Sequence, residues 1–369
     1  MKDKGEQAVT IKDISEKLNI SITSVHRALQ GKEGVSDELR EKIQKLADEM
    51  GYAPNYAAAS MKRKKLKIAV VLPVDEGERS FYYDYIWEGI QDYSSTLKVL
   101  NVELENCSVN NEEEQYIQLK RIADIGVQEY AGVLTFSFTR RANVLMQMQR
   151  LVTQDIKTVV IDDDLKEPEG VFCIPPNEKA IGEVAGEFIS LVTPEKGTVL
   201  VSGGRDDSKV HKNKIESFKK HLQQNSPGLR IEVIPAYSNL LGKENTLYQE
   251  LVKALKEIDD VVAVYALTSN DNLPIVEALE DCGKLAAVKI VGSDINEETE
   301  ALLINGRLHA VINQGAYAKG YMGLQILSDY IVKRIVPEAR HYCTIDIVLK
   351  GNIMFYTPTK HIKNKLIRR

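Results

Sequence analysis

The feature that most constrains the fold is a regular alternation of short apolar runs and amphipathic stretches from residue 66 onward. The apolar runs are rich in Val, Ile and Leu, as strands that are buried on both faces are. They lie at 66–72, 132–136, 158–162, 197–201, 263–267 and 288–292. Stretches with apolar residues at helical spacing lie between most of them, at 83–97, 112–126, 177–191 and 272–283. This alternation predicts doubly wound, parallel α/β layers.

The spacing of these runs predicts about eleven or twelve strands, which is more than one sheet of this type usually holds. We therefore expect residues 66–358 to form two lobes, each built on a parallel sheet. Ligands of such folds bind at the carboxyl ends of the strands. The region is interpreted as a two-lobed ligand-binding domain.

Residues 8–53 show a different pattern, with three short helices and no strand. Thr10 and Asp13 have the spacing of a capping box, and Ser21 and Ser36 precede two further helical stretches. Two short helices joined by a tight turn, with a third packed beneath them, predict a helix-turn-helix domain. The pattern alone also fits a three-helix cluster that binds protein.

In a helix-turn-helix domain the second helix enters the major groove, and its first residues face base edges. Those residues here are Ile22, Thr23, Ser24, His26 and Arg27. Arg27 can pair with two acceptors of guanine, and Thr23 can hydrogen-bond a base or contact a thymine methyl. Ser21 and Thr10 stand at helix N-termini, which suits them to phosphate contacts.

The charge distribution separates the two regions. Residues 1–65 carry 13 Lys and Arg against 10 Asp and Glu, whereas the rest carries 35 against 43 and the net charge is −5. A mildly basic head on an acidic body suits a DNA-contacting domain attached to a larger domain that does not touch DNA.

The connector at 54–65 contains an alanine-rich segment followed by the basic run Lys62–Lys65. So short a helix is marginal by itself. We expect it to fold only when a partner and DNA brace it, with the basic run beside phosphates. The alternative is a solvated linker.

The sequence offers no membrane segment and no catalytic motif. No apolar run approaches the ~20 residues that span a bilayer, and the polar start MKDKGEQAVT lacks a signal-peptide core. We expect a cytoplasmic protein without a membrane partner. Nucleotide-binding glycine motifs, GxSxG and HExxH are absent. We therefore expect that the protein is not an enzyme and that it binds neither a metal ion nor a cofactor.

Two further features of the sequence bear on metal binding and on disulfides. The run Asp162-Asp163-Asp164 could hold Mg²⁺, although such runs also form ordinary polar loops. Cys107, Cys173, Cys282 and Cys343 lack CxxC spacing and are interpreted as reduced thiols. An α/β enzyme or a secreted solute-binding protein could use the same two-lobed core, but the latter would need a signal peptide and would lack residues 8–65.

The segment TIKDISEKLNISITSVHRALQGKEGVSDELREKIQKLADEMGYAPN closely resembles the headpiece of the lactose-repressor (LacI/GalR) family. The resemblance implies a DNA interface that also includes Asn55 and a hinge helix that pairs across a dimer. Met61 occupies the position of the apolar side chain that such a helix inserts into the minor groove, where leucine is usual. His26 replaces the usual serine before Arg27, and Ala59 stands where many members have arginine or glutamine.

The body resembles the periplasmic-binding-protein type I core of the same family, which has two Rossmann-like lobes, three crossovers and a ligand cleft. The resemblance places the first lobe at about 66–174 and 310–338 and the second at about 175–308 and 340–358, with a basic tail at 359–369. The ligand-binding residues that it implies are Ser80, Tyr82, Tyr83, Asp162, Lys212, Asn270, Asp294 and Gln314.

These residue types suit a sugar, since planar Asp, Asn and Gln side chains pair with hydroxyls and tyrosines stack on a ring face. Lys212 falls where sugar-binding members have an arginine, which leaves open a phosphorylated or acidic sugar or a closed site. Asn177 and Asn270 could instead cap helices.

Together, the resemblance implies a ligand-responsive transcription regulator, a repressor of carbohydrate-metabolism genes. It would act as a homodimer on a pseudo-palindromic operator of double-stranded DNA, with a sugar or sugar phosphate as the effector.

Overall fold

The computed structural model describes residues 9–29, 31–61, 63–73, 81–136, 142–205, 208–236 and 244–356. The chain divides into two compact units, Met1–Arg63 and Lys64–Arg369. The boundary between them falls within the predicted connector at 54–65. Each unit is described by itself below.

The first unit contains the three predicted helices and a fourth. They are α1 (Ile11–Leu18), α2 (Ile22–Leu29), α3 (Asp37–Glu49) and α4 (Tyr56–Met61). The capping box forms as predicted: the backbone N–H of Thr10 donates to Asp13 Oδ2 at 2.7 Å, and that of Asp13 donates to Thr10 Oγ1 at 3.4 Å. Five side chains, one to two from each of α1, α2 and α3, form the small core: Ile14, Val25, Ala28, Ile43 and Ala47.

The alanine-rich segment of the connector is helical in the single chain, as α4, which corrects the expectation that it folds only when a partner and DNA brace it. Asn55 stabilises its start, because its Oδ1 accepts a hydrogen bond from the backbone N–H of Ala58 at 2.9 Å. This side-chain cap satisfies one of the free donors that make a helix of this length marginal.

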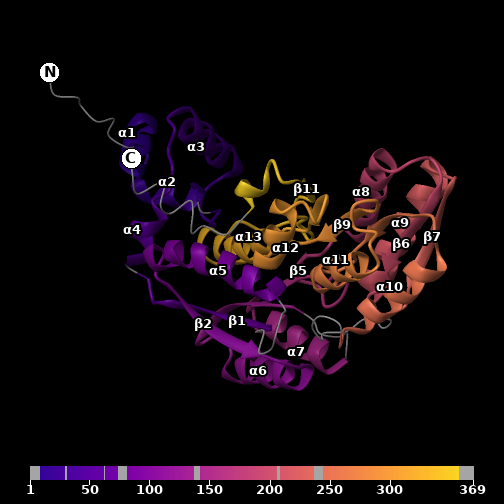
Figure 1. Ribbon diagram of the computed structural model, residues 1–369. Helices are drawn as coiled ribbons and strands as arrows, with labels where there is room; N and C mark the ends of the chain where they lie inside the picture. The colour runs from indigo at the N-terminus through magenta and orange to yellow at the C-terminus, as the bar shows by residue number, and fades with distance from the viewer. Residues whose placement is uncertain are drawn as a thin grey trace. The chain divides into compact units, whose positions relative to one another are not determined.

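The second unit contains two sheets, each covered by helices, as the alternating pattern predicted (Figure 1). The first sheet has the order β2-β1-β3-β4-β5, and all of its strands are parallel. Its strands are β1 (Leu66–Pro73), β2 (Val102–Val109), β3 (Tyr130–Thr135), β4 (Lys157–Ile161) and β5 (Val171–Ile174). The helices of this lobe are α5 (Phe81–Val99), α6 (Glu112–Ile125), α7 (Ala142–Thr153) and α13 (Ala316–Ser328).

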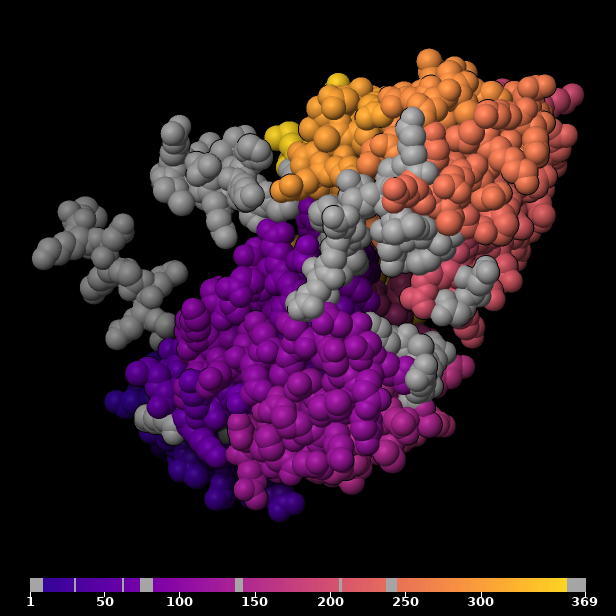
Figure 2. All heavy atoms as spheres, turned by 60° about the horizontal axis from the view of Figure 1, so that its bottom comes forward, coloured from indigo at the N-terminus to yellow at the C-terminus, as the bar shows by residue number. Residues whose placement is uncertain are grey.

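The second sheet has the order β11-β10-β9-β8-β6-β7, in which only β11 is antiparallel among the described strands. Its strands are β6 (Gly197–Ser202), β7 (Leu229–Ile234), β8 (Val261–Tyr265), β9 (Lys289–Ser293), β10 (Ala310–Asn313) and β11 (Asp346–Val348). The helices of this lobe are α8 (Glu178–Val192), α9 (Lys209–Asn225), α10 (Thr246–Glu257), α11 (Asn272–Asp281) and α12 (Glu297–Ile304). Figure 2 shows the two lobes as separate masses, coloured purple to magenta and salmon to orange.

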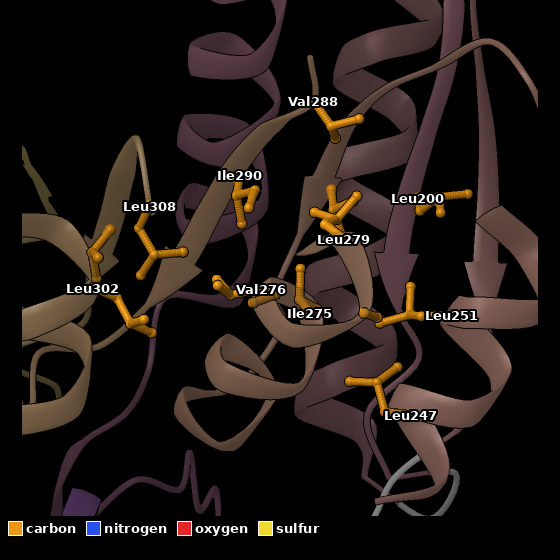
Figure 3. Close-up of a cluster of buried hydrophobic side chains, with 14 of the residues drawn as sticks. Leu200, Leu247, Leu251, Ile275, Val276, Leu279, Val288, Ile290, Leu302 and Leu308 are labelled. Carbon is orange, nitrogen blue, oxygen red and sulfur yellow. The ribbon is translucent and has the colours of Figure 1, made fainter. Parts of the chain in front are cut away.

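Apolar side chains fill both faces of the second sheet. On one face, a large cluster joins the sheet to α10, α11 and α12, as Figure 3 shows for ten labelled residues from Leu200 to Leu308. On the other face, Phe218 of α9 stacks on Tyr265 of β8, with ring centroids 5.1 Å apart. Burial on both faces is the reason why the central strands read as continuous apolar runs.

The structure corrects the predicted lobe boundary. The predicted boundary places residues 310–313 in the first lobe, but they form β10, which pairs with β9 in the second sheet. The chain crosses over only after this strand, at Gly315, whose φ of 72° lies in the left-handed region that favours glycine. The residues that follow, in α13, do lie in the first lobe, where α13 packs on α5.

Two of the strands that the apolar runs did not reveal are edge strands. In β7 exposed residues alternate with partly or fully buried ones, and β2 also has several exposed positions. The predicted basic tail at 359–369 lies outside the described residues. Cys107, Cys173, Cys282 and Cys343 are free thiols, as predicted. Among the described helices, none is both long and apolar enough to cross a bilayer.

Two glycines bring α5 and α13 close together. A Cβ atom added at Gly320 would overlap the backbone of Ile86, and one added at Gly89 would overlap the backbone of Tyr317. Because backbone atoms cannot yield as the end of a side chain can, this helix pair excludes any larger residue at either position.

We expect Gly320→Ala to lower the free energy of unfolding by about 2–3 kcal/mol, the upper part of the range for overpacking. Gly351→Ala is the matched control, because nothing lies within 4 Å of a Cβ atom built there. Chemical denaturation of both variants measures the difference. Equal stability of the two variants would contradict the close packing of α5 on α13.

Candidate functional site

The residues predicted to read DNA lie on the solvent-facing side of α2. Ile22, Thr23 and Arg27 are exposed, and Ser24 and His26 are partly exposed. The opposite side of α2 packs into the core of the first unit. Helical periodicity therefore gives α2 one buried face and one exposed face. The exposed face presents the apolar side chain of Ile22, the hydroxyl group of Thr23 and the guanidinium group of Arg27.

Ser21 holds the start of this helix. Its Oγ accepts a hydrogen bond from the backbone N–H of Ser24 at 3.0 Å and lies 2.8 Å from Ser24 Oγ. Thr10 has the same role at the start of α1. In the connector, Asn55 is exposed as well as being the cap of α4, and Met61 is 85% exposed.

Arg40 is a residue that the sequence did not single out. Its guanidinium group, on α3, donates to the backbone oxygens of Ala28 at 3.2 Å and Lys32 at 2.8 Å. These two hydrogen bonds fix the end of α2 and the turn that follows it. The turn also contains Gly34, where an added Cβ would lie 2.9 Å from Arg27 Nη1.

In the second unit, a cavity of about 280 Å³ lies where strand ends of the two lobes meet. Six of the eight predicted ligand-binding residues line it: Tyr82, Tyr83, Asp162, Asn270, Asp294 and Gln314. The tyrosines come from the first turn of α5, and the other four follow directly or closely on β4, β8, β9 and β10. Ser80 lies outside the described residues. These four residues therefore lie at the carboxyl ends of strands, where ligands of such folds are expected to bind.

In the first lobe, a buried lysine binds two of these residues. Lys319 of α13 is 1% exposed, and its Nζ lies 2.6 Å from Asp162 Oδ1 and 2.7 Å from the Tyr82 hydroxyl. The Tyr82 hydroxyl also donates to Asp162 Oδ1 at 2.8 Å. Burial and the neighbouring carboxylate of Asp162 raise the pKa of Tyr82. The second carboxylate oxygen of Asp162 is buried and has no hydrogen-bond partner in the described part of the chain.

In the second lobe, Asp294 and Gln314 form a two-point pair. The backbone N–H of Gln314 donates to Asp294 Oδ1 at 3.0 Å, and its Nε2 donates to Oδ2 at 2.8 Å. Gln314 Oε1 accepts from Lys214 Nζ at 2.5 Å. Burial raises the pKa of Asp294, and burial lowers the pKa of Lys214 to about 8.

The structure replaces Lys212 with Lys214 as the lysine of the site. Lys212 is exposed on α9 and does not line the cavity. Lys214, Phe218 and Leu222 recur every four residues and form the buried face of the helix. That spacing was a signal in the sequence, since it points Lys214 inward together with two core residues.

Of the two asparagines that could cap helices, Asn177 does so and Asn270 does not. Asn177 caps α8, because its Oδ1 accepts from the backbone N–H of Ala180 at 3.1 Å. Asn270 caps no helix: Thr268 precedes the short helical turn there, and Asp271 precedes α11. Within the described residues, the amide of Asn270 has no hydrogen-bond partner and is left to the cavity.

The aspartate run after β4 forms ion pairs. Asp162 pairs with Lys319, and Asp164 pairs with Arg340 Nε at 2.5 Å. Among the described residues, no group of His, Cys, Asp and Glu has an arrangement that could hold a metal ion. Two further basic residues that the sequence did not single out, Arg205 and His211, line the cavity beside Lys214.

The low pKa of Lys214 predicts a pH dependence of stability. The folded pKa of about 8 lies below the ordinary 10.5, so between these values the unfolded chain binds more protons and stability rises with pH. Compared with Lys214→Met, the wild type should gain roughly 3 kcal/mol of unfolding free energy between pH 8 and 10.5.

Chemical denaturation at pH 7.5, 9 and 10.5 measures this gain. Lys212→Met is the matched control, because it removes an exposed lysine two residues earlier on the same helix. We expect the difference in unfolding free energy between the wild type and Lys212→Met to stay constant from pH 7.5 to 10.5. If the difference from the wild type stayed constant with pH for Lys214→Met as well, that result would contradict the lowered pKa of a buried Lys214.

Comparison with known proteins agrees with this architecture. Residues 10–55 match the model of bacterial regulatory proteins of the lacI family, and residues 68–334 match a periplasmic binding protein domain. Among curated proteins, catabolite control protein A of Staphylococcus aureus is 22% identical over 358 residues, covering 95% of this chain and 99% of that protein. The protein of the same name from Priestia megaterium is 20% identical over 339 residues, covering 90% and 95%.

Among solved structures, a LacI transcriptional regulator from Bacteroides fragilis superposes with a TM-score of 0.66 at 19% identity, covering 80% of this chain and 100% of that one. The glucose-galactose binding protein GanP from Geobacillus stearothermophilus gives 0.65 at 21% identity, covering 79% and 99%. These structures share the fold of the second unit. The chain therefore carries the DNA-binding domain of the lacI family of bacterial regulatory proteins, joined to a domain that belongs to the periplasmic binding protein family.

Proposed function

We propose that this protein is a carbohydrate-responsive transcription regulator that binds a pseudo-palindromic operator as a homodimer and changes its operator affinity when a sugar occupies the cavity between the lobes. The observation that carries the proposal is the presence, in one chain, of an exposed recognition face on α2 and a cavity lined by hydrogen-bonding groups from both lobes.

The chemistry of the cavity supports a polyhydroxylated ligand. Asp162 offers an unpartnered acceptor, and Asn270 offers an amide with no partner among the described residues. Tyr82 and Tyr83 contact each other edge to face, at 5.6 Å between ring centroids, and can pack on a sugar ring. The glucose-galactose binding protein named above has the same fold, and its name supports the same ligand class.

The charges of the cavity favour a neutral sugar over a sugar phosphate. Lys319 faces Asp162, and Lys214 reaches Asp294 through Gln314, so each buried lysine is balanced by a carboxylate. A phosphate would have to be held by Arg205 and His211, and Arg205 is exposed. A neutral polyol can replace the internal hydrogen bonds without leaving either lysine or either carboxylate unpaired.

Coupling between the two units is expected to follow from differential binding. Asp162 belongs to the first lobe and Asp294 to the second, so a ligand that contacts both stabilises one arrangement of the lobes. In a two-fold dimer this arrangement determines whether the two connectors at 54–65 pair with each other on DNA. Effector and operator must then alter each other's affinity by the same factor.

A dimer with two recognition helices requires two half-sites related by two-fold symmetry, hence the pseudo-palindrome. We also propose that the protein acts in the cytoplasm, where both operator and sugar are available to it.

Selection from random duplexes with the purified full-length protein tests the proposal. We expect one enriched, two-fold symmetric motif, and a shift in affinity for it when one member of a sugar panel is added. Neutral sugars and their phosphates form separate arms of the panel, which measures the preference argued above. Enrichment of no motif in any arm would overturn the DNA-binding role, and an enriched motif that no sugar affects would overturn the sensor role.

A further inference from the structure

A second cavity of about 290 Å³ lies in the two-lobed unit, next to the one described above. Tyr82, Ser269 and Asp294 form the wall that the two cavities share. The rest of its lining is separate and comes from α5, the loop after β9, the crossover between β10 and α13, and residues 344–356. None of these additional residues belongs to the proposed sugar site.

The lining of this cavity is acidic. Glu88 and Asp346 contribute two carboxyl groups besides Asp294, which is already held by Gln314, and no Lys, Arg or His is among the described residues that line the cavity. Tyr85 reports the same environment, since burial and the neighbouring carboxylates of Glu88 and Glu297 raise its pKa. A cavity of this charge favours a positively charged occupant.

The lining is also aromatic. Tyr85, Tyr317, Phe355 and Tyr356 border the cavity together with the three carboxyl groups, and Phe355 is 74% exposed. Aromatic rings attract cations through their negative faces and also bury apolar surface, and rings combined with carboxylates are how proteins recognise organic ammonium groups. A hydrated metal ion would gain little from the rings, so the occupant should carry its charge on an apolar or aromatic body.

Asn296 provides an independent indication of a ligand. It is 2% exposed, and its Oδ1 is used by the start of α12, where it accepts from the backbone N–H of Thr299 at 2.7 Å. Its amide nitrogen has no hydrogen-bond partner within the described part of the chain, and the residue lines the cavity. The side chain is held in place at its oxygen and leaves its nitrogen to the cavity, where a ligand with an acceptor oxygen would use this donor.

We propose that this second cavity binds a small organic cation, a primary or substituted ammonium group on an aromatic or apolar body that also carries an oxygen acceptor. Glu88 and Asp346 would bind the ammonium group of the ligand. Tyr85 and Tyr317 would pack against its apolar or aromatic body, and Asn296 would donate a hydrogen bond to its oxygen. The residues that would hold this cation are distinct from those of the proposed sugar site.

Isothermal titration calorimetry of the full-length protein with three para-substituted phenols of similar size tests the proposal. Tyramine carries an ammonium group, 4-ethylphenol is its uncharged counterpart, and 4-hydroxyphenylacetate carries a negative charge. We expect tyramine to bind at least about tenfold more tightly than either of the others, because a charge-assisted hydrogen bond is worth more than a neutral contact. Equal affinities, or no binding by tyramine, would overturn the proposal.

Two variants locate the binding. Glu88→Gln and Asp346→Asn each remove one negative charge without changing the size of the side chain, and each should weaken tyramine binding by about tenfold. Glu232→Gln is the matched control: it removes an exposed carboxylate from β7, at the opposite edge of the sheet from β11. If tyramine binds the first two variants as tightly as it binds the control, the cavity is not the site.

Discussion

Arg27→Ala is expected to remove sequence discrimination while leaving much of the affinity for random DNA. The guanidinium group of Arg27 is exposed on the recognition face of α2, where its two parallel donors can match a guanine edge. Loss of such a pair costs about 1–3 kcal/mol for each half-site. Binding to random duplexes rests on phosphate contacts and should fall much less. Fluorescence anisotropy with the selected operator and a scrambled duplex, at one salt concentration, measures both affinities.

Two further variants separate base reading from charge. Arg27→Lys keeps the positive charge but loses the planar fork, so it should resemble Arg27→Ala in specificity and the wild type in affinity for scrambled DNA. Lys45→Ala removes an exposed positive charge from α3 of the same unit and should preserve the ratio of the two affinities. An equal loss on operator and scrambled duplex for Arg27→Ala would show that Arg27 contacts phosphate instead.

Asp294→Asn is expected to abolish the response to the effector and to preserve operator binding. Asp294 is buried at the end of β9 with a φ of 53°, a left-handed conformation that asparagine tolerates as well as aspartate does. The substitution removes one acceptor from a carboxylate that holds Gln314 at two points and faces the cavity. A buried hydrogen bond to a charged group is worth about 1.5–3 kcal/mol, so effector affinity should fall roughly ten- to hundredfold.

The measurement is operator affinity with and without the sugar found in the panel. Asp294→Ala should abolish the response as completely as Asp294→Asn, and operator binding by each variant reports that the protein is folded. Asn177→Ser is the control, since Asn177 caps α8 and serine can replace it there. A normal response from both Asp294 variants would remove Asp294 from the sugar site.

Local patterns in the sequence were enough to predict the first three helices of the first unit, although not that α4 is helical in the single chain. Its capping residues and apolar spacing act within one or two helical turns, so α1, α2 and α3 begin and end where those residues stand. The exposed face of α2 follows from the same periodicity. The central strands of the second unit other than β10 were equally visible, because burial on both faces leaves a continuous apolar run. The six cavity residues followed from the family resemblance.

Two parts of the site were decided only by tertiary contacts. Lys319 lies in α13 and belongs to the cavity network solely because α13 packs on α5 and places its ammonium group beside Tyr82 and Asp162, which are far away in sequence. The assignment of β10 to the second lobe likewise depends on pairing with β9. A residue's local sequence determines its helix or strand and the face that it presents. Which distant group contacts that face depends on how the whole chain packs, and local sequence patterns do not determine it.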